Sequence, residues 1–217
     1  MRTDTDRALA ALNAPDSSLR LKAALHLGSN PDPALAGALI DRSATEPDFF
    51  VRDMLTWALT RLPPAGTVPA LLAELTSATP QARSQALHTL SKIGDRGVWP
   101  AITPALLHDP DDEVARAAWR TAVLLTPEEA RAALAEELIR ELARGDRDLR
   151  LSLSRALTAL GDMIEPALRS AVSGPDEEVR AHATATLHLL RDPEAGFDLA
   201  VTAATRTVAF GPGSPAC

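Results

Sequence analysis

The stretch Pro175-Asp176-Glu177-Glu178-Val179-Arg180 contains the clearest of six copies of a short motif in the chain. Four copies have the form Asp-x-x-apolar-Arg, and they end at Arg20, Arg52, Arg150 and Arg180. Two copies are degenerate, because one begins at Thr79 in place of Asp and the other ends at Ala115 in place of Arg. The six copies end at positions 20, 52, 83, 115, 150 and 180, so they are spaced 30 to 35 residues apart. Self-similarity at such a period predicts a solenoid of stacked structural repeats.

Each copy of the motif predicts the start of a helix. The Asp side chain can accept hydrogen bonds from the free N–H groups of the first helical turn, and we expect Thr79 to do the same in the third copy. In four copies a proline precedes the Asp, where it ends the helix before. An apolar-periodic segment of about 13 residues follows each copy. Gly94 and Gly161 close two of these segments at a position that favours a left-handed backbone.

The repeat pattern predicts an all-α fold. With one helix before each motif and one after it, we expect a right-handed α-α superhelix of about six helix pairs. Residues 1–210 are predicted to form a single domain, in which residues 193–210 make a C-terminal capping helix. Residues 211–217 are expected to be a disordered tail. The aromatic content of only 3% agrees with closely packed Ala- and Leu-rich helices rather than with β-structure.

Four positions of each second helix fall on one face when 100° is assigned to each residue. Counted from the motif arginine, they are the residue before it and the third, seventh and tenth residues after it. Nearly all of them are Leu, Val, Ile or Ala, so this stripe is the predicted core. Leu90 and Leu157 lie at the seventh position of two copies and are expected to be buried.

Composition and charge argue against several functional classes. The net charge of −7 disfavours nucleic acid and anionic membranes as general partners. The single cysteine, Cys217, permits neither a disulfide within the chain nor a thiolate metal site, and we expect no metal and no cofactor. Residues 1–6 show no apolar signal segment, and no stretch is long and apolar enough to cross a membrane. We therefore expect a cytoplasmic protein, and the preference for Arg over Lys suggests a bacterial, GC-rich source.

The motif, the Ala- and Leu-rich helix after it and the closing Leu-Gly-Asp resemble HEAT repeats, of the short type also found in phycobiliprotein lyase subunits. The resemblance covers about residues 5–190. It implies that the motif Asp and Arg residues form a hydrogen-bonded ladder between neighbouring repeats. The residues concerned are Asp16, Asp48, Asp111, Asp146 and Asp176 with Arg20, Arg52, Arg83, Arg150 and Arg180. Because Thr79 and Ala115 depart from the pattern, we expect the ladder to be interrupted between the third and fourth repeats.

A candidate binding groove follows from the face opposite the core, since second helices line the concave side in HEAT-like repeats. The fifth residue after the motif arginine is Trp57, His88, Arg120 and Arg155 in four successive repeats. Beside this row, the first residue after the motif arginine is Asp53, Ser84 and Arg116 in three of them. This row predicts a groove for an acidic peptide, a protein carboxylate or a small anionic ligand, with Trp57 as apolar anchor. Alternatively, Trp57 packs against a neighbouring helix and the arginines pair with nearby Glu.

The leading functional prediction is a non-enzymatic, monomeric scaffold or adaptor that binds a protein partner in this groove. A small anionic ligand is a further possibility. No catalytic residues are predicted, since the sequence has no Gly-rich phosphate loop, His-Glu-x-x-His or Gly-x-Ser-x-Gly motif. The alternative is an enzyme on a HEAT-like scaffold, either a small-molecule lyase or a protein similar to the alkylation-repair DNA glycosylases. Asp53 and Trp57 are the residues that a glycosylase would use, although the acidic chain lacks a long basic stripe.

Overall fold

The computed structural model describes residues 4–192, and these residues form helices and no strands. The α-helices are α1 (Asp4–Ala11), α2 (Ser17–Ser29), α3 (Ala36–Ser43), α4 (Phe49–Thr60), α5 (Pro64–Glu74), α6 (Pro80–Ile93), α7 (Pro104–Leu107), α8 (Asp112–Leu125), α9 (Arg131–Ile139), α10 (Arg147–Thr158), α11 (Glu165–Val172) and α12 (Glu177–Arg191). Short 3₁₀ helices, η1 (Pro33–Leu35), η2 (Arg96–Ala101), η3 (Glu128–Ala130) and η4 (Asp162–Ile164), precede four of the first helices. The helices between residues 4 and 192 thus form the six expected pairs, and the chain is an all-α solenoid.

The chain divides into two compact units, residues 1–121 and 122–217, and the boundary falls within α8. The expectation of a single domain over residues 1–210 stays a prediction. The expected capping helix at residues 193–210 and the expected tail at residues 211–217 lie outside the described residues. No helix between residues 4 and 192 is long and apolar enough to cross a membrane.

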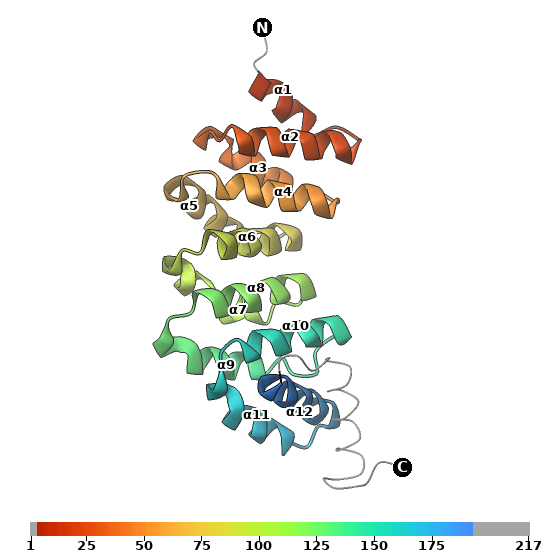
Figure 1. Cartoon of the computed structure of the whole chain (residues 1–217), viewed down its shortest axis with the longest axis vertical. Coiled ribbons are helices and arrows are strands. Elements are labelled where there is room, and N and C mark those ends of the chain that lie inside the picture. Colours follow the sequence, from red (N-terminus) through yellow and green to blue (C-terminus); the bar gives the residue numbers. More distant parts are fainter. Residues whose placement is uncertain (1–3, 193–217) are drawn as a thin grey trace. The chain divides into compact units, whose positions relative to one another are not determined.

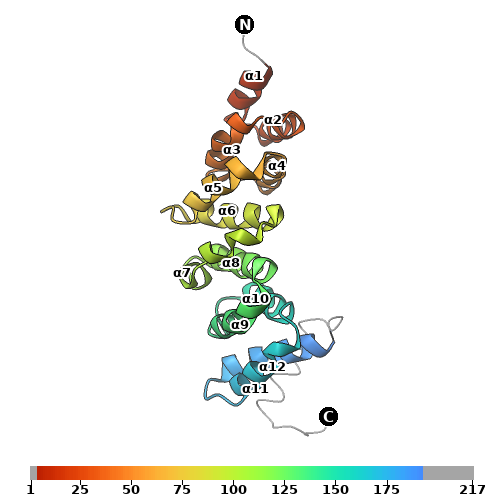
Figure 2. The ribbon, with the colours of Figure 1, turned by 90° about the vertical axis from the view of Figure 1, so that its left-hand side faces the viewer.

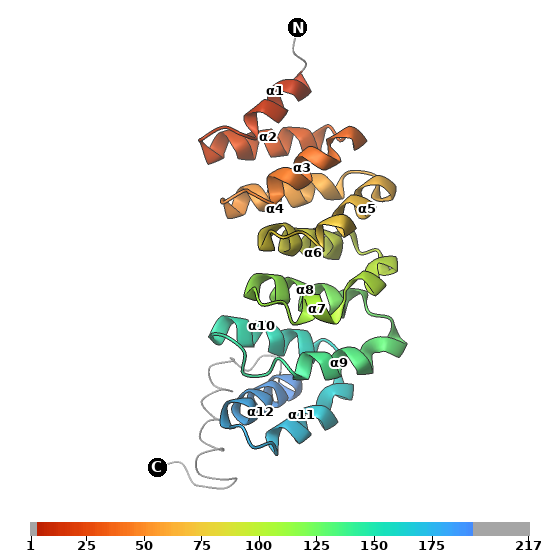
Figure 3. The same ribbon diagram turned by 180° about the vertical axis from the view of Figure 1, so that it is seen from behind.

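In the first unit the two helices of each pair form two layers. Figure 1 shows α2, α4, α6 and α8 as successive rows that lie side by side. In Figure 2 the helices α3, α5 and α7 lie in the other layer, and Figure 3 shows this layer from behind. In the second unit α9 and α10 contact each other, α11 packs on α12, and α12 packs on α10. The alternation of first and second helices therefore persists in both units.

The motif Asp residues cap their own helices, as the sequence predicts. A carboxylate oxygen of Asp48 accepts hydrogen bonds from the N–H groups of Phe50 and Val51 at 2.9 and 3.1 Å. Asp16, Asp111, Asp146 and Asp176 accept comparable bonds at the starts of their helices. Thr79 is the exception, because its side chain makes no capping bond before α6. The capping role expected of Thr79 is therefore wrong, and Pro80 at the first helical position lowers the need for it by removing an N–H group.

The motif arginines do not pair with the motif Asp residues, in contrast to the ladder that the resemblance implies. The Nη1 group of Arg20, Arg52, Arg83 and Arg180 instead donates to the backbone carbonyl six residues earlier, at 2.7 to 3.1 Å. The physical reason is that each Asp is already engaged with the N–H groups of its own helix. The arginine thus closes the turn that leads into its own helix.

Two acidic residues outside the motif accept hydrogen bonds from the motif arginine of the preceding repeat. Glu46 accepts from Nε and Nη2 of Arg20, both at 2.8 Å, and Asp109 accepts from Nε and Nη2 of Arg83, both at 3.0 Å. Each acid lies two residues before the next motif and also accepts from the N–H group of that motif's first residue, at 2.9 Å. The expected interruption between the third and fourth repeats is therefore wrong, because Arg83 and Asp109 join them. The third repeat has Ser77 at the position of these acids.

The predicted core stripe is buried along most of its length. Leu55, Leu59, Leu90, Leu153 and Leu157 are fully buried or nearly so. The first repeat departs at both ends of the stripe, where Leu19 and Asn30 are exposed. A second buried face includes Leu87 and Trp119, whose indole N–H donates to the carbonyl of Leu107 at 2.8 Å. Helices α4 and α6 are buried on this face too, because α4 packs on α2, α3 and α6, and α6 packs on α3, α4 and α5.

Candidate functional site

A surface pocket of about 250 Å³ lies across α4, α6 and α8 in the first unit. Its walls are Phe49, Arg52 and Asp53 from α4, Ser84, Gln85 and His88 from α6, and Glu113, Ala117 and Arg120 from α8. Four of the residues predicted from the sequence, Asp53, Ser84, His88 and Arg120, line this pocket. The repeat explains why they meet, because residues at equal distances from the motif arginine occupy equivalent positions on adjacent parallel helices.

Arg120 is the most available cation of the pocket. Its side chain is exposed, and its Nε donates to the carbonyl of Arg116 at 3.3 Å. No carboxylate within the described residues forms an ion pair with the Arg120 guanidinium, whereas Arg116 approaches Glu113 at 3.6 Å. The alternative expectation, that the arginines pair with Glu, therefore holds for Arg116 and not for Arg120.

His88 lines the pocket, and its surroundings favour the neutral imidazole. Its burial lowers the pKa of the imidazole, and the positive charges of Lys92 and Arg120 lower it further against the opposing effect of Asp53. The described residues place no hydrogen-bond partner on the ring of His88. A neutral imidazole can donate one hydrogen bond and accept one, so His88 can serve a polar ligand group.

Trp57 is half-buried and does not line the pocket. The six-membered part of its ring packs on Gly28 of α2, where a side chain would collide with it. The guanidinium of Arg61 lies 6.0 Å from the centre of the ring, within the range of a cation–π contact. This contact with α2 is the packing that the alternative expectation describes. The role of Trp57 as a ligand anchor stays a prediction.

Replacing Gly28 with Ala is expected to destabilise the first unit by about 1 to 3 kcal/mol, because a well-packed site has no room for the added methyl group. The new Cβ would lie 2.3 Å from a ring carbon of Trp57 and 2.9 Å from the Cα of Ala58. Gly37→Ala is the control, since a Cβ there meets nothing within 4 Å. Urea denaturation followed by Trp fluorescence should show the loss for Gly28→Ala only. Equal stabilities would contradict the close contact.

Arg155 lies on α10 in the second unit, where its side chain is exposed. It does not line the pocket of the first unit, and neither does Arg116. The structure therefore gathers Asp53, Ser84, His88 and Arg120 at one pocket, while Trp57, Arg116 and Arg155 lie elsewhere. A binding role for those three residues stays a prediction.

Phe49 is the wall residue that the sequence analysis did not single out. It is 64% exposed and forms an edge-to-face pair with Phe50, with ring centres 5.6 Å apart. The signal is visible in the sequence, because the third residue before the motif arginine is polar, charged or proline in the other five repeats. Because most of its surface is exposed, the Phe49 side chain is accessible to a ligand.

The pocket contains the residue types of a hydrolytic triad, but not its hydrogen bonds. The hydroxyl of Ser84 donates to the carbonyl of Gln81 at 3.1 Å. No hydrogen bond among the described residues joins Ser84, His88 and Asp53, although a triad requires the nucleophile, base and orienting acid to be linked. Residues 4–192 also contain no cluster of His, Cys, Asp and Glu that could hold a metal ion.

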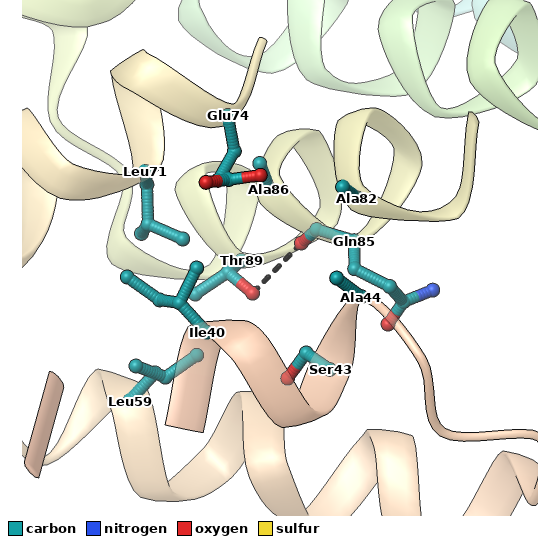
Figure 4. Close-up of a pocket in the computed structure, with 10 residues that line it drawn as sticks. All are labelled: Ile40, Ser43, Ala44, Leu59, Leu71, Glu74, Ala82, Gln85, Ala86 and Thr89. Carbon is teal, nitrogen blue, oxygen red and sulfur yellow. Dashed lines mark hydrogen bonds between the residues drawn. The ribbon is translucent and has the colours of Figure 1, made fainter. Parts of the chain in front are cut away.

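Two other cavities in the first unit differ from this pocket. One of about 450 Å³ lies between α1 and α3, around Leu12, Asp41 and Arg42. The other holds only about 10 Å³, between side chains of α3, α5 and α6 such as Ile40 and Leu71. Figure 4 shows its mostly apolar lining and the hydrogen bond from the Thr89 hydroxyl to the Gln85 carbonyl. A space of this size admits one water molecule and no larger ligand.

His182 is a buried titratable group in the second unit. Its Nδ1 accepts a hydrogen bond from the N–H of Ala143 at 3.0 Å, so the proton of the neutral ring is on Nε2. Nε2 lies 3.0 Å from both the Arg150 carbonyl and the Ser154 hydroxyl. Burial lowers the pKa of His182 to about 4, against the hydrogen bond to the Arg150 carbonyl, which raises it. These contacts fasten α12 to α10 and to the turn before it.

The lowered pKa of His182 predicts a loss of stability in mild acid. Below about pH 6.5 the unfolded chain takes up a proton that the folded ring binds only near pH 4, so protons favour unfolding. From pH 7.5 to pH 5 we expect this group to remove roughly 2 kcal/mol of stability. The measurement is denaturation of the wild type and of His182→Gln at both pH values. The variant should show a smaller change, and an unchanged dependence would exclude His182 as its source.

Comparisons with known proteins agree with the repeat pattern. Residues 68–141 match the protein family described as HEAT repeats. None of the curated proteins compared with the chain matches it. Among solved structures, an engineered protein is similar with a TM-score of 0.48 and 20% identity, covering 94% of this chain and 98% of that one.

A second similar structure is the complex of CpcE and CpcF of phycocyanin lyase from Nostoc sp. PCC7120. Its TM-score is 0.47 and its identity 19%, covering 94% of this chain and 87% of that one. The match over residues 68–141 confirms the resemblance to HEAT repeats that was stated from the sequence. The matched stretch includes α6, α7 and α8 with two of the three helices that line the pocket. Residues 68–141 of this all-α solenoid thus match the HEAT-repeat family.

Proposed function

We propose that the protein is a non-enzymatic HEAT-repeat scaffold or adaptor that binds a protein partner in the pocket across α4, α6 and α8. The observation that supports this proposal is the pairing of an exposed aromatic wall, Phe49, with the available guanidinium of Arg120 in one pocket. Aromatic and arginine side chains dominate the binding energy of most protein interfaces. We also propose that the protein is cytoplasmic, bacterial and monomeric.

The local charge of the pocket also supports an anionic group in the partner. The whole chain carries a net charge of −7, and within the described residues neither Arg120 nor Arg52 of the pocket forms an ion pair with a carboxylate. The Arg120 side chain can form a bidentate bond with a carboxylate, and such bonds are among the strongest that proteins form. A small anionic ligand would satisfy the same group and is the second candidate occupant.

The enzyme alternatives have less support. A glycosylase of the type considered above would need Asp53 and Trp57 in one channel, but Trp57 packs on Gly28 and Asp53 lines the pocket. For a small-molecule lyase, nothing within residues 4–192 supplies a linked acid and base at the pocket. The scaffold therefore remains the function that the geometry favours.

The experiment is a pull-down from the source cytosol with wild type, Arg120→Glu and Arg96→Glu, analysed by mass spectrometry for proteins and small molecules. Arg96 is exposed at the start of η2, does not line the pocket, and its replacement changes the net charge equally. A protein retained by wild type and Arg96→Glu but lost by Arg120→Glu is the expected result. Equal retention by all three would remove the pocket from the proposal, and a small molecule in place of a protein would favour the enzyme alternatives.

A further inference from the structure

The pocket has two chemically different ends along the direction of its helices. Phe49 lies three positions before the motif arginine of its repeat, whereas Arg120 lies five positions after the equivalent position of its own repeat. His88 also lies five positions after its motif arginine, so it shares the end of Arg120. Eight positions of an α-helix correspond to about 12 Å along its axis. One end of the pocket therefore has Phe49 near Arg52, whose Nη1 donates to the carbonyls of Glu46 and Pro47, and the other end has His88 and Arg120.

The acidic wall residues strengthen this polarity. Glu113 lies near the aromatic end, two positions before the motif position of its repeat, and Asp53 lies one position after Arg52. Arg52 offsets only part of this charge, so a carboxylate at this end meets two acids and one cation, whereas a carboxylate beside Arg120 is attracted. The pocket thus discriminates between the two orientations of a ligand that has one acidic end and one apolar end.

We propose that the occupant is an extended peptide segment of the partner, with a carboxylate on Arg120 and an aromatic or branched apolar side chain on Phe49. This inference rests on the proposed function, since it specifies the partner of the same pocket. An extended chain advances about 3.3 Å per residue, so the axial separation alone requires at least three to four residues between the two groups. A small anion lacks the length to engage both ends.

His88 gives the binding a further property. A carboxylate that sits between Arg120 and His88 favours the protonated imidazole, and the charged groups that act on this ring are Lys92, Arg120 and Asp53. Binding of the peptide should therefore take up a proton near neutral pH, and the affinity should increase as the pH falls from 7.5 to 6. In His88→Ala this increase should disappear.

The first test is selection of peptides from a random 12-residue display library on the full chain. We expect enriched sequences to share an acidic residue and an aromatic or branched apolar residue separated by three or more positions. Enrichment of sequences without an acid, or of none at all, would overturn the proposal. The pull-down described above is independent of this outcome, so a partner captured there through Arg120 would leave the proposed function intact while the peptide proposal fails.

The second test uses two matched pairs of variants and a labelled selected peptide in a fluorescence anisotropy assay. Phe49→Ala should weaken binding at least about tenfold, while Phe50→Ala should not, because Phe50 is 69% exposed beside Phe49 but does not line the pocket. Arg120→Gln should weaken binding at least about tenfold relative to Arg96→Gln. Equal effects within either pair would contradict the assignment of that end. Circular dichroism confirms that each variant is folded.

Discussion

Replacing Glu46 with Gln is expected to lower the free energy of unfolding by about 3 to 5 kcal/mol. This is the usual cost of removing one partner of a buried ion pair, because the other partner keeps a buried charge that nothing balances. Glu46 is 0% exposed and accepts hydrogen bonds from Arg20, Arg42 and the N–H of Asp48. The amide of Gln cannot accept all of these bonds, and its NH₂ group would face guanidinium donors. Arg20, which is only 6% exposed, would keep its charge without a counter-ion.

The measurement is guanidinium chloride denaturation followed by circular dichroism, with Glu178→Gln as the control. Glu178 also accepts from an arginine, Arg150, but it is largely exposed, and an exposed pair contributes about 0 to 1 kcal/mol. If both variants lost the same small amount, Glu46 would not be the centre of a buried network.

Glu46 also makes the stability of the first unit depend on pH in acid. Burial by itself would raise the pKa of this carboxyl, but the hydrogen bonds from Arg20, Asp48 and Arg42 outweigh burial and lower the pKa to about 2. The stabilisation is therefore complete above the unfolded pKa of about 4.3 and is lost as the pH falls towards 2. In Glu46→Gln the stability should depend less on pH over this range.

The second large effect is expected for Leu90→Ala, which should cost about 2 to 5 kcal/mol. Leu90 is 0% exposed in the middle of the core stripe of α6, so truncation removes buried apolar surface and leaves a cavity. Leu25→Ala on α2 is the matched control, because Leu25 is 47% exposed and its truncation opens no cavity. A loss below about 1 kcal/mol for Leu90→Ala would be incompatible with the burial of this side chain. Leu157→Ala tests the same stripe in the second unit.

The sequence predicts those parts of the fold that depend on neighbours along the chain. The capping bonds of Asp48 and Asp176 are local, and the stripe that contains Leu90 follows from helical periodicity alone. The bonds between repeats are less predictable because Glu46 and Asp109 lie outside the motif. Their role depends on where the preceding repeat places its arginine in space.

In the candidate site, too, some residues were predictable from the sequence and others depend on contacts in space. The register of the repeats brings His88 and Arg120 to one pocket, as the helical positions predict. Trp57 shares that register but turns to α2, because Gly28 leaves a space that the indole ring fills. A helical glycine opposite a tryptophan was the signal for this contact. Phe49 was overlooked because it lies at the start of the helix, outside the positions counted for the groove.

The uneven distribution of the acids between repeats has a consequence for how the first unit opens. The ion pairs Arg20–Glu46 and Arg83–Asp109 join the first repeat to the second and the third to the fourth. Between the second and third repeats, Ser77 replaces the acid, and Gln81 instead donates uncharged hydrogen bonds to the carbonyls of Ser43 and Glu46. In native-state hydrogen exchange, residues 4–60 and residues 64–121 should therefore unfold as two cooperative blocks, because the interface between them is the less stable one. The pocket extends from Phe49 in the second repeat to Arg120 in the fourth, so it crosses the interface between these two blocks. A bound ligand would contact both blocks and should therefore slow the local unfolding of each.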